Sequence, residues 1–198
     1  MIDHKLASRR QILASGAAAG LVLAADDALA QPLLSPTPAC HDGDVPTRPE
    51  IEGPFFKPAS PLRGDLREPG LAGRPVELSG FVLTRSCRPV AGALIDLWHA
   101  DDQGDYDNKG FRLRGHVLTD AEGRYRFRTI VPALYSGRTR HFHYKVQPAG
   151  ARLLTTQLYF PDEPMNRRDG MFHSELVMRM ARVGEDIEGR FDFIVATR

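Results

Sequence analysis

Alternating apolar and polar residues dominate the chain from about residue 76 onward. Seven short runs of this kind are separated by turn residues, and they cover 76–84, 93–98, 115–119, 124–130, 141–147, 153–160 and 191–195. Successive side chains of a β-strand point to opposite faces, so this alternation predicts strands with one buried face. Because helical patterns are few, the chain is predicted to be all-β and to form an antiparallel β-sandwich.

Two segments lack this alternation. Residues 161–188 have no sustained period and are predicted to be irregular or briefly helical, and residues 31–50 are rich in Pro, Thr and Asp. We interpret 31–75 as an extended N-terminal arm and 76–198 as the sandwich domain, whose long loops carry the candidate site. Asp120–Gly123 places a glycine late in a loop between two strand-like runs, which is typical of a hairpin turn.

The first thirty residues are typical of an export signal. Ser8–Leu13 has a twin-arginine pattern, an apolar stretch follows to Ala25, and Ala28–Ala30 supplies small residues for cleavage. An amphipathic first helix is the alternative, but Asp26 and Asp27 interrupt it. We therefore expect cleavage after Ala30 and a periplasmic or secreted mature protein. Twin-arginine export moves folded proteins, many of which already carry a cofactor.

Charge and cysteine content narrow the class further. Lys and Arg number 26 and Asp and Glu 25, so the chain offers no excess of positive charge for nucleic acid. After residue 30 there is no apolar run long enough to span a membrane. Cys40 and Cys87 are the only cysteines, and an even pair in an oxidising compartment predicts a disulfide, with two unrelated thiols as the alternative.

Candidate metal ligands occur in and before the run 141–147. His141 and His143 are two residues apart, so both imidazoles of a strand would point to one face and could reach one ion. Two histidines on a solvated sheet face are the alternative. Tyr135 lies in the preceding loop and Tyr106 in an earlier loop, where a tyrosine alone is usually a packing residue.

Several motifs together resemble the intradiol ring-cleavage dioxygenases, the family of protocatechuate and catechol dioxygenases. The matching segments are EGPFF at 52–56, PVAGA at 89–93, WHADDQGDY at 98–106, TDAEGRYRF at 119–127, PALY at 132–135, RTRHFH at 138–143 and TQLYFP at 156–161. The resemblance therefore spans about residues 50–165. It implies one non-haem Fe(III) per chain, held by Tyr106, Tyr135, His141 and His143.

The chemistry of these residue types agrees with that ligand set. Phenolate is a hard anionic donor that suits Fe(III) better than Zn(II) or Cu(I). A site of two histidines and one carboxylate would hold Fe(II) instead, but no H-x-D or H-x-E pair with a distant histidine occurs here. A tyrosine-ligated copper site is a further alternative.

The resemblance also implies the reaction and its substrates. A small aromatic diol of the catechol type and O₂ would react so that the ring opens between the two hydroxylated carbons, giving a cis,cis-muconate-type diacid. Tyr135 would be displaced by the diol and accept its proton, Arg138 would stabilise negative charge, and Gln157 would orient the substrate. An exported β-sandwich that binds polysaccharide or lignin-like material without catalysis is the competing class.

Three departures from the family pattern limit what carries over. Phe55 and Phe56 stand where tyrosine is frequent, so the family's substrate preference does not transfer, and Ser136 replaces a frequent proline. The N-terminal helical region of the catechol-cleaving branch is missing, so we do not expect its mode of dimerisation. His99, His116 and His173 match no ligand position of the family and are expected to be structural.

Overall fold

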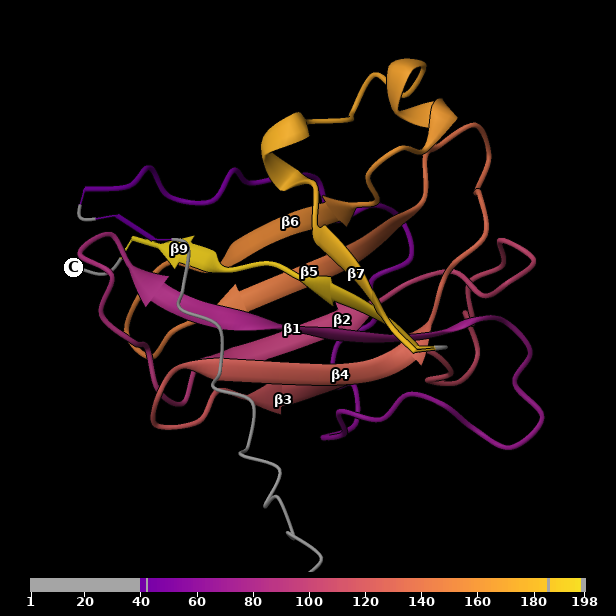
Figure 1. Ribbon diagram of the computed structural model, residues 1–198. Coiled ribbons are helices and arrows are strands. Elements are labelled where there is room, and N and C mark those ends of the chain that lie inside the picture. Colours follow the sequence, from indigo (N-terminus) through magenta and orange to yellow (C-terminus); the bar gives the residue numbers. More distant parts are fainter. Residues whose placement is uncertain (1–39, 42, 185, 197–198) are drawn as a thin grey trace, which may run out of the picture. The chain divides into compact units, whose positions relative to one another are not determined.

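The computed structural model describes residues 40, 41, 43–184 and 186–196 (Figure 1). The predicted signal peptide and the first part of the predicted arm, residues 1–39, lie outside this range. The described residues form nine strands and two short 3₁₀ helices. They are β1 (Pro75–Thr84), β2 (Leu94–Trp98), β3 (Arg114–Leu118), β4 (Arg124–Ile130), β5 (His141–Gln147), β6 (Leu154–Tyr159), η1 (Pro164–Arg167), η2 (Ser174–Leu176), β7 (Arg179–Val183), β8 (Asp186–Arg190) and β9 (Phe193–Val195).

The strands form two sheets that pack face to face. One sheet has the order β3-β2-β5-β6, and every neighbouring pair in it is antiparallel. The other has the order β4-β1-β8-β7, with β9 also paired to β1. The predicted all-β sandwich is confirmed, with the addition that β1 pairs in parallel with both β8 and β9.

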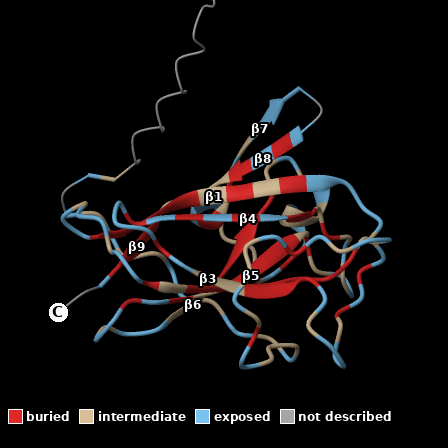
Figure 2. Ribbon diagram, turned by 90° about the horizontal axis from the view of Figure 1, so that it is seen from below, coloured by how far each residue is buried: buried red, intermediate tan, exposed pale blue. Residues whose placement is uncertain are grey.

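The core fills the space between the sheets because alternating side chains of both sheets point inward. Phe142 and Tyr144 from β5 are fully buried, as are Ile95 from β2 and Phe127 from β4. Figure 2 shows β1 and β5 as largely buried. Each fully buried apolar side chain of this size stabilises the fold by roughly 1.5–3 kcal/mol relative to exposure. This core holds β2, β5 and β6 rigidly in one layer.

Two sequence predictions about connections were wrong. Asp120–Gly123 does form a tight turn, with Gly123 N donating to Asp120 O at 3.0 Å. However, β3 pairs with β2 and β4 pairs with β1, so this turn connects the two sheets and is not a hairpin. The turn residues fix where the chain reverses, whereas the buried faces of the flanking strands decide their partners.

The second error concerns residues 161–188. The two short 3₁₀ helices agree with the prediction, but Arg179–Val183 and Asp186–Arg190 form the antiparallel pair β7 and β8. β7 is mostly exposed at the sheet edge, as Figure 2 shows. In β8 the buried positions are Ile187 and Gly189. Because glycine has no apolar side chain, the sequence shows almost no alternation of apolar and polar residues there.

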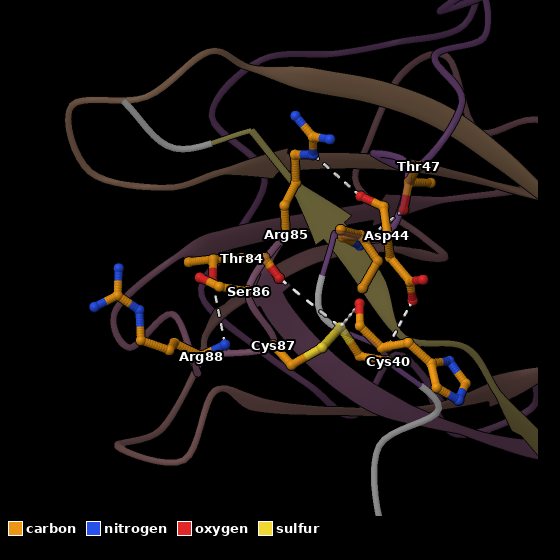
Figure 3. The surroundings of a disulfide bond; sticks show 10 residues. Cys40, Asp44, Thr47, Thr84, Arg85, Ser86, Cys87 and Arg88 are labelled. Atoms are coloured by element: carbon orange, nitrogen blue, oxygen red, sulfur yellow. Dashed lines mark hydrogen bonds between the residues drawn. A yellow bond between two sulfur atoms is a disulfide. The ribbon is translucent and has the colours of Figure 1, made fainter.

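An extended segment, residues 43–74, precedes β1 and contributes no strand to either sheet. It is held by main-chain contacts, among them Thr47 N to Ile194 O at 2.8 Å and Glu50 N to Thr155 O at 2.8 Å. The predicted Cys40–Cys87 disulfide is confirmed, with 5.6 Å between the two Cα atoms (Figure 3). The described part of the chain contains no helix with the length and apolar character needed to cross a bilayer.

Candidate metal centre

His141 and His143 lie on the face of the four-stranded sheet that points away from the sandwich core. Phe142 between them is fully buried in the core, so the strand period places both imidazoles on the opposite face. Both histidines are nevertheless only 4% exposed, because the arm covers this face. Their Nε2 atoms are 3.1 Å apart. The structure therefore brings the two predicted imidazole ligands together.

Both imidazoles are held neutral, which is the form that binds metal. Burial lowers the pKa of His141 to about 4 and lowers that of His143 well below its ordinary value. The Nδ1 of His141 lies 2.6 Å from Thr139 O. Because a carbonyl can only accept, Nδ1 carries the proton and the Nε2 of His141 presents its lone pair.

His143 is fixed between two neighbours. Its ring is parallel to the ring of Trp98 within 8°, with 4.9 Å between centroids. On the arm, a Cβ added to Gly53 would lie 3.3 Å from Cε1 of His143, and Gly53 has a φ of +74°. Position 53 therefore favours glycine for two reasons: the arm backbone lies close to the His143 ring, and φ is positive. The sequence had placed Gly53 in a family motif without a role.

One row of paired residues crosses the sheet at the level of His143. Trp98 pairs with His143 across β2 and β5, and His143 pairs with Gln157 across β5 and β6. On the other side, Trp98 pairs with Arg114 on β3. Arg114 is 1% exposed and donates from Nη1 to the main-chain oxygen of Phe55. Sheet pairing therefore positions Gln157, and a buried arginine that the sequence did not indicate holds the arm.

The two candidate tyrosines lie in loops at the end of the same sheet. The ring centroids of Tyr106 and Tyr135 are 5.5 Å apart at an interplanar angle of 89°, and Tyr106 is 6.1 Å from His143. Phe55 stacks on Tyr106 at 4.4 Å and meets the edge of Tyr135 at 5.2 Å. Burial raises the pKa of Tyr106, although the positive charges of Arg138 and Arg114 oppose the shift.

The loops that carry the tyrosines are tied to each other. The Asp101 carboxylate accepts hydrogen bonds from the main-chain N–H groups of Gln103 and Asp105, which shapes the loop before Tyr106. Asp101 O accepts from Ala133 N at 2.9 Å, shortly before Tyr135. The two loops are thus held together by contacts that involve neither phenol.

Arg138 and Gln157 meet directly. The Nη2 of Arg138 donates to Oε1 of Gln157 at 2.7 Å, and Nε2 of Gln157 donates to Ile51 O at 3.0 Å. Arg138 Nε donates to both oxygens of Asp169, at 3.0 and 2.8 Å. Asp169 lies in the irregular segment after β6, where sequence reasoning had identified no functional residue.

The donor set fits a hard cation. Two nitrogen ligands at about 2.1 Å from one ion and roughly at right angles lie about 3 Å apart, close to the observed Nε2 separation. Nδ1 of His143 is buried and has no hydrogen-bond partner among the described residues. Within the same residues no group of three or more His, Cys, Asp or Glu side chains converges. An ion bound here would therefore depend on oxygens of Tyr106 and Tyr135.

His99, His116 and His173 have structural partners. His99 is 1% exposed, with Nδ1 2.7 Å from Ala100 O and Nε2 2.7 Å from the Thr129 hydroxyl. The Nδ1 of His116 lies 3.1 Å from the Ser60 hydroxyl, and Nε2 of His173 lies 3.3 Å from Glu50. Among the described residues none of the three hydrogen-bonds to or stacks on Tyr106, Tyr135, His141 or His143, in line with their predicted structural role.

Comparison with known proteins gives the family. A family model described as Dioxygenase matches residues 51–195. Catechol 1,2-dioxygenase 2 of Acinetobacter lwoffii is 32% identical over 140 residues, which are 58% of this chain and 51% of that relative. Chlorocatechol 1,2-dioxygenase of Rhodococcus opacus is 30% identical over 191 residues, covering 73% of this chain and 70% of that relative.

A solved structure extends the comparison to the fold. It is the dioxygenase domain of a dioxygenase and carbohydrate-binding protein fusion from the cellulolytic bacterium Streptomyces sp. SirexAA-E. The two are 48% identical, with a TM-score of 0.76, and the match covers 78% of this chain and 100% of that domain. The chain spans about half the length of the first curated relatives it matches.

The fold and these matches place the chain among the β-sandwich proteins of the dioxygenase family. The chain belongs to the intradiol ring-cleavage dioxygenase family, as its motifs indicated.

Proposed function

We propose that this chain is an exported non-haem Fe(III) dioxygenase that opens a catechol-type ring between its two hydroxylated carbons. The observation that carries the proposal is the convergence of His141, His143, Tyr106 and Tyr135 on the covered outer face of the four-stranded sheet. O₂ supplies both oxygen atoms that are inserted, and the product is a cis,cis-muconate-type diacid. The names of the relatives support a catechol-type substrate.

The two tyrosines are suited to different tasks. Tyr106 is 9% exposed and lies beneath Phe55, so it is suited to remain in place through the reaction. Tyr135 is partly exposed in a loop, and Ser136 after it has a φ of +39°. We assign Tyr135 as the residue whose phenolate oxygen accepts a proton from the incoming diol, which is general-base work.

Tyr106, Tyr135, His141 and His143 would hold Fe(III), which would supply the Lewis-acid and redox chemistry that makes a bound diol reactive toward O₂. Arg138 supplies a fixed positive charge for the oxyanion that develops on the substrate. Such preorganised stabilisation acts strongly where water is excluded. Gln157, held by Arg138 and Ile51 O, orients the substrate. Phe55 and Gly53 close the site from the arm side.

Iron content, absorption and oxygen uptake test this proposal together. Purified mature protein should contain one iron per chain and show a broad visible band from charge transfer between tyrosinate and Fe(III). It should consume O₂ with catechol and form a ring-opened diacid, to be identified by mass spectrometry. A colourless protein with stoichiometric zinc and no iron would refute the assignment.

Export is proposed on separate grounds. The twin-arginine pattern at Ser8–Leu13 and the Cys40–Cys87 disulfide both support an oxidising compartment outside the cytoplasm. Replacing Arg9 and Arg10 by lysine should retain the protein in the cytoplasm. N-terminal sequencing of the exported wild type should begin at Gln31, and a cytoplasmic location of the wild type would contradict the proposal.

A further inference from the structure

A buried carboxylate supports the arginine of the candidate site. The Asp169 side chain is 2% exposed, and that of Arg138 is 16% exposed. Asp169 receives hydrogen bonds from Arg138 Nε, from Thr139 N at 2.9 Å and from Met171 N at 2.9 Å. Burial alone would raise the pKa of Asp169, but these donors lower it below its ordinary value. The carboxylate is thus fixed from three sides.

Two contacts define the orientation of the Arg138 guanidinium. Asp169 engages Nε at one edge, and Gln157 engages Nη2 at the other. Arg138 also lies within hydrogen-bonding reach of the Tyr159 hydroxyl. A planar group held at two edges loses little further freedom when a substrate arrives.

We propose that Asp169 is a positioning residue for the ring-opening reaction: it fixes Arg138 and, through Arg138, Gln157. This inference rests on the proposed function, because it concerns the arginine assigned to the substrate. None of the hydrogen bonds of Asp169 reaches a candidate ligand, so it acts through another residue. It comes from the segment after β6, about thirty positions from Arg138, and therefore couples that segment to the site.

Asp169→Asn is the informative variant. An amide has one acceptor oxygen and no charge, whereas both carboxylate oxygens accept here, so the NH₂ must face one of the donors and the contact to Arg138 is weakened. We expect the variant to keep iron and its visible band and to lose about 10- to 100-fold in kcat, as small misplacements do.

Glu163→Gln is the matched control. Glu163 lies in the same segment and makes the same kind of contact, carboxylate oxygen to the Nε of Arg140 at 2.8 Å. It should retain the wild-type kcat. An equal loss in both variants would show that loosening the segment is sufficient, and would overturn the specific role of Asp169.

A double-mutant cycle separates positioning from general stability. If Asp169 acts through Arg138, adding Asp169→Asn to Arg138→Ala should cause no further loss of kcat. A structural role would make the two losses multiply, and that result would overturn the proposal. Should Asp169→Asn fold poorly, Arg138→Lys tests the same contact, because lysine keeps the charge but has no Nε. Wild-type kcat in Arg138→Lys would also overturn it.

A readout other than activity distinguishes this inference from the proposed function. The Nε–H of Arg138 should exchange slowly with solvent in NMR spectra of the diamagnetic metal-free protein, and Asp169→Asn should accelerate the exchange. If wild-type protein cleaves no catechol but this protection is found, the proposed function fails and the positioning contact stands. Equal exchange in wild type and variant refutes the positioning contact itself.

Discussion

Gly53→Ala tests how tightly the candidate ligand His143 is held. The new methyl would lie 3.3 Å from Cε1 of His143, closer than ordinary van der Waals contact. The ring cannot retreat freely, because Trp98 stacks on His143 with 4.9 Å between centroids. The imidazole or the arm must therefore shift by a few tenths of an ångström.

The substitution also has a backbone cost that must be subtracted. Gly53 has a φ of +74°, and an L-residue in this region costs about 1–2 kcal/mol. Gly150 provides the control: its φ is +68°, and an added Cβ would meet nothing within 4 Å. Both alanine variants should lose about 1–2 kcal/mol of unfolding free energy, because they share this strain.

Only Gly53→Ala should disturb the metal centre. Displacement of a ligand by less than an ångström is expected to lower kcat/KM by roughly tenfold, together with a shift of the visible band. Urea unfolding, iron content and oxygen uptake with catechol should be measured on both variants. If the two have equal kcat/KM and equal spectra, the arm does not constrain His143 and the reasoning is wrong.

Three further predictions follow from other contacts. Cys40→Ser should lower the unfolding free energy by about 3–4 kcal/mol on the chain-entropy model, measured by urea unfolding, and dithiothreitol should weaken only the wild type. Tyr135→Phe removes a candidate ligand, so its charge-transfer band should shift and iron retention fall; an unchanged spectrum would exclude Tyr135 as a ligand. Burial raises the pKa of Asp96 from 3.8 to about 6. Folding therefore favours the neutral carboxyl, and this contribution to the unfolding free energy is complete below about pH 4 and is lost as pH rises through about 6. Asp96→Asn should therefore unfold less readily than wild type at pH 7, by about 3 kcal/mol at most, and show no gain well below pH 4; a gain of equal size at both pH values would contradict this.

The sequence predicted side-chain positions correctly where the two-residue repeat of a strand determines which face a side chain occupies. Two residues of one strand share a face, so the placement of His141 and His143 followed from their spacing, and Phe142 between them is in the core as alternation requires. Tyr106 and Tyr135 were different, because nothing local to a loop tyrosine shows where its ring lies. They were identified only through the family resemblance.

The contacts that the sequence did not reveal are long-range. Asp169 reaches Arg138 because of the path that the segment after β6 follows, and this segment has no period from which a path could be inferred. Arg114 is nearly fully buried although arginine is a residue expected at the surface. For β7 and β8 the difficulty is physical, since an edge hairpin with little buried surface needs few apolar residues.

The arm is joined to the sandwich in part through its own main chain. Glu50 N, Ile51 O and Phe55 O are all engaged by the sandwich, and such contacts do not depend on the identity of the arm side chains. The side chain at 51 can therefore vary while the arm stays attached, whereas Phe55 and Phe56 also pack on Tyr106 and Trp98. An arm taken from a relative could therefore attach through the same main-chain contacts while presenting different side chains to the candidate site.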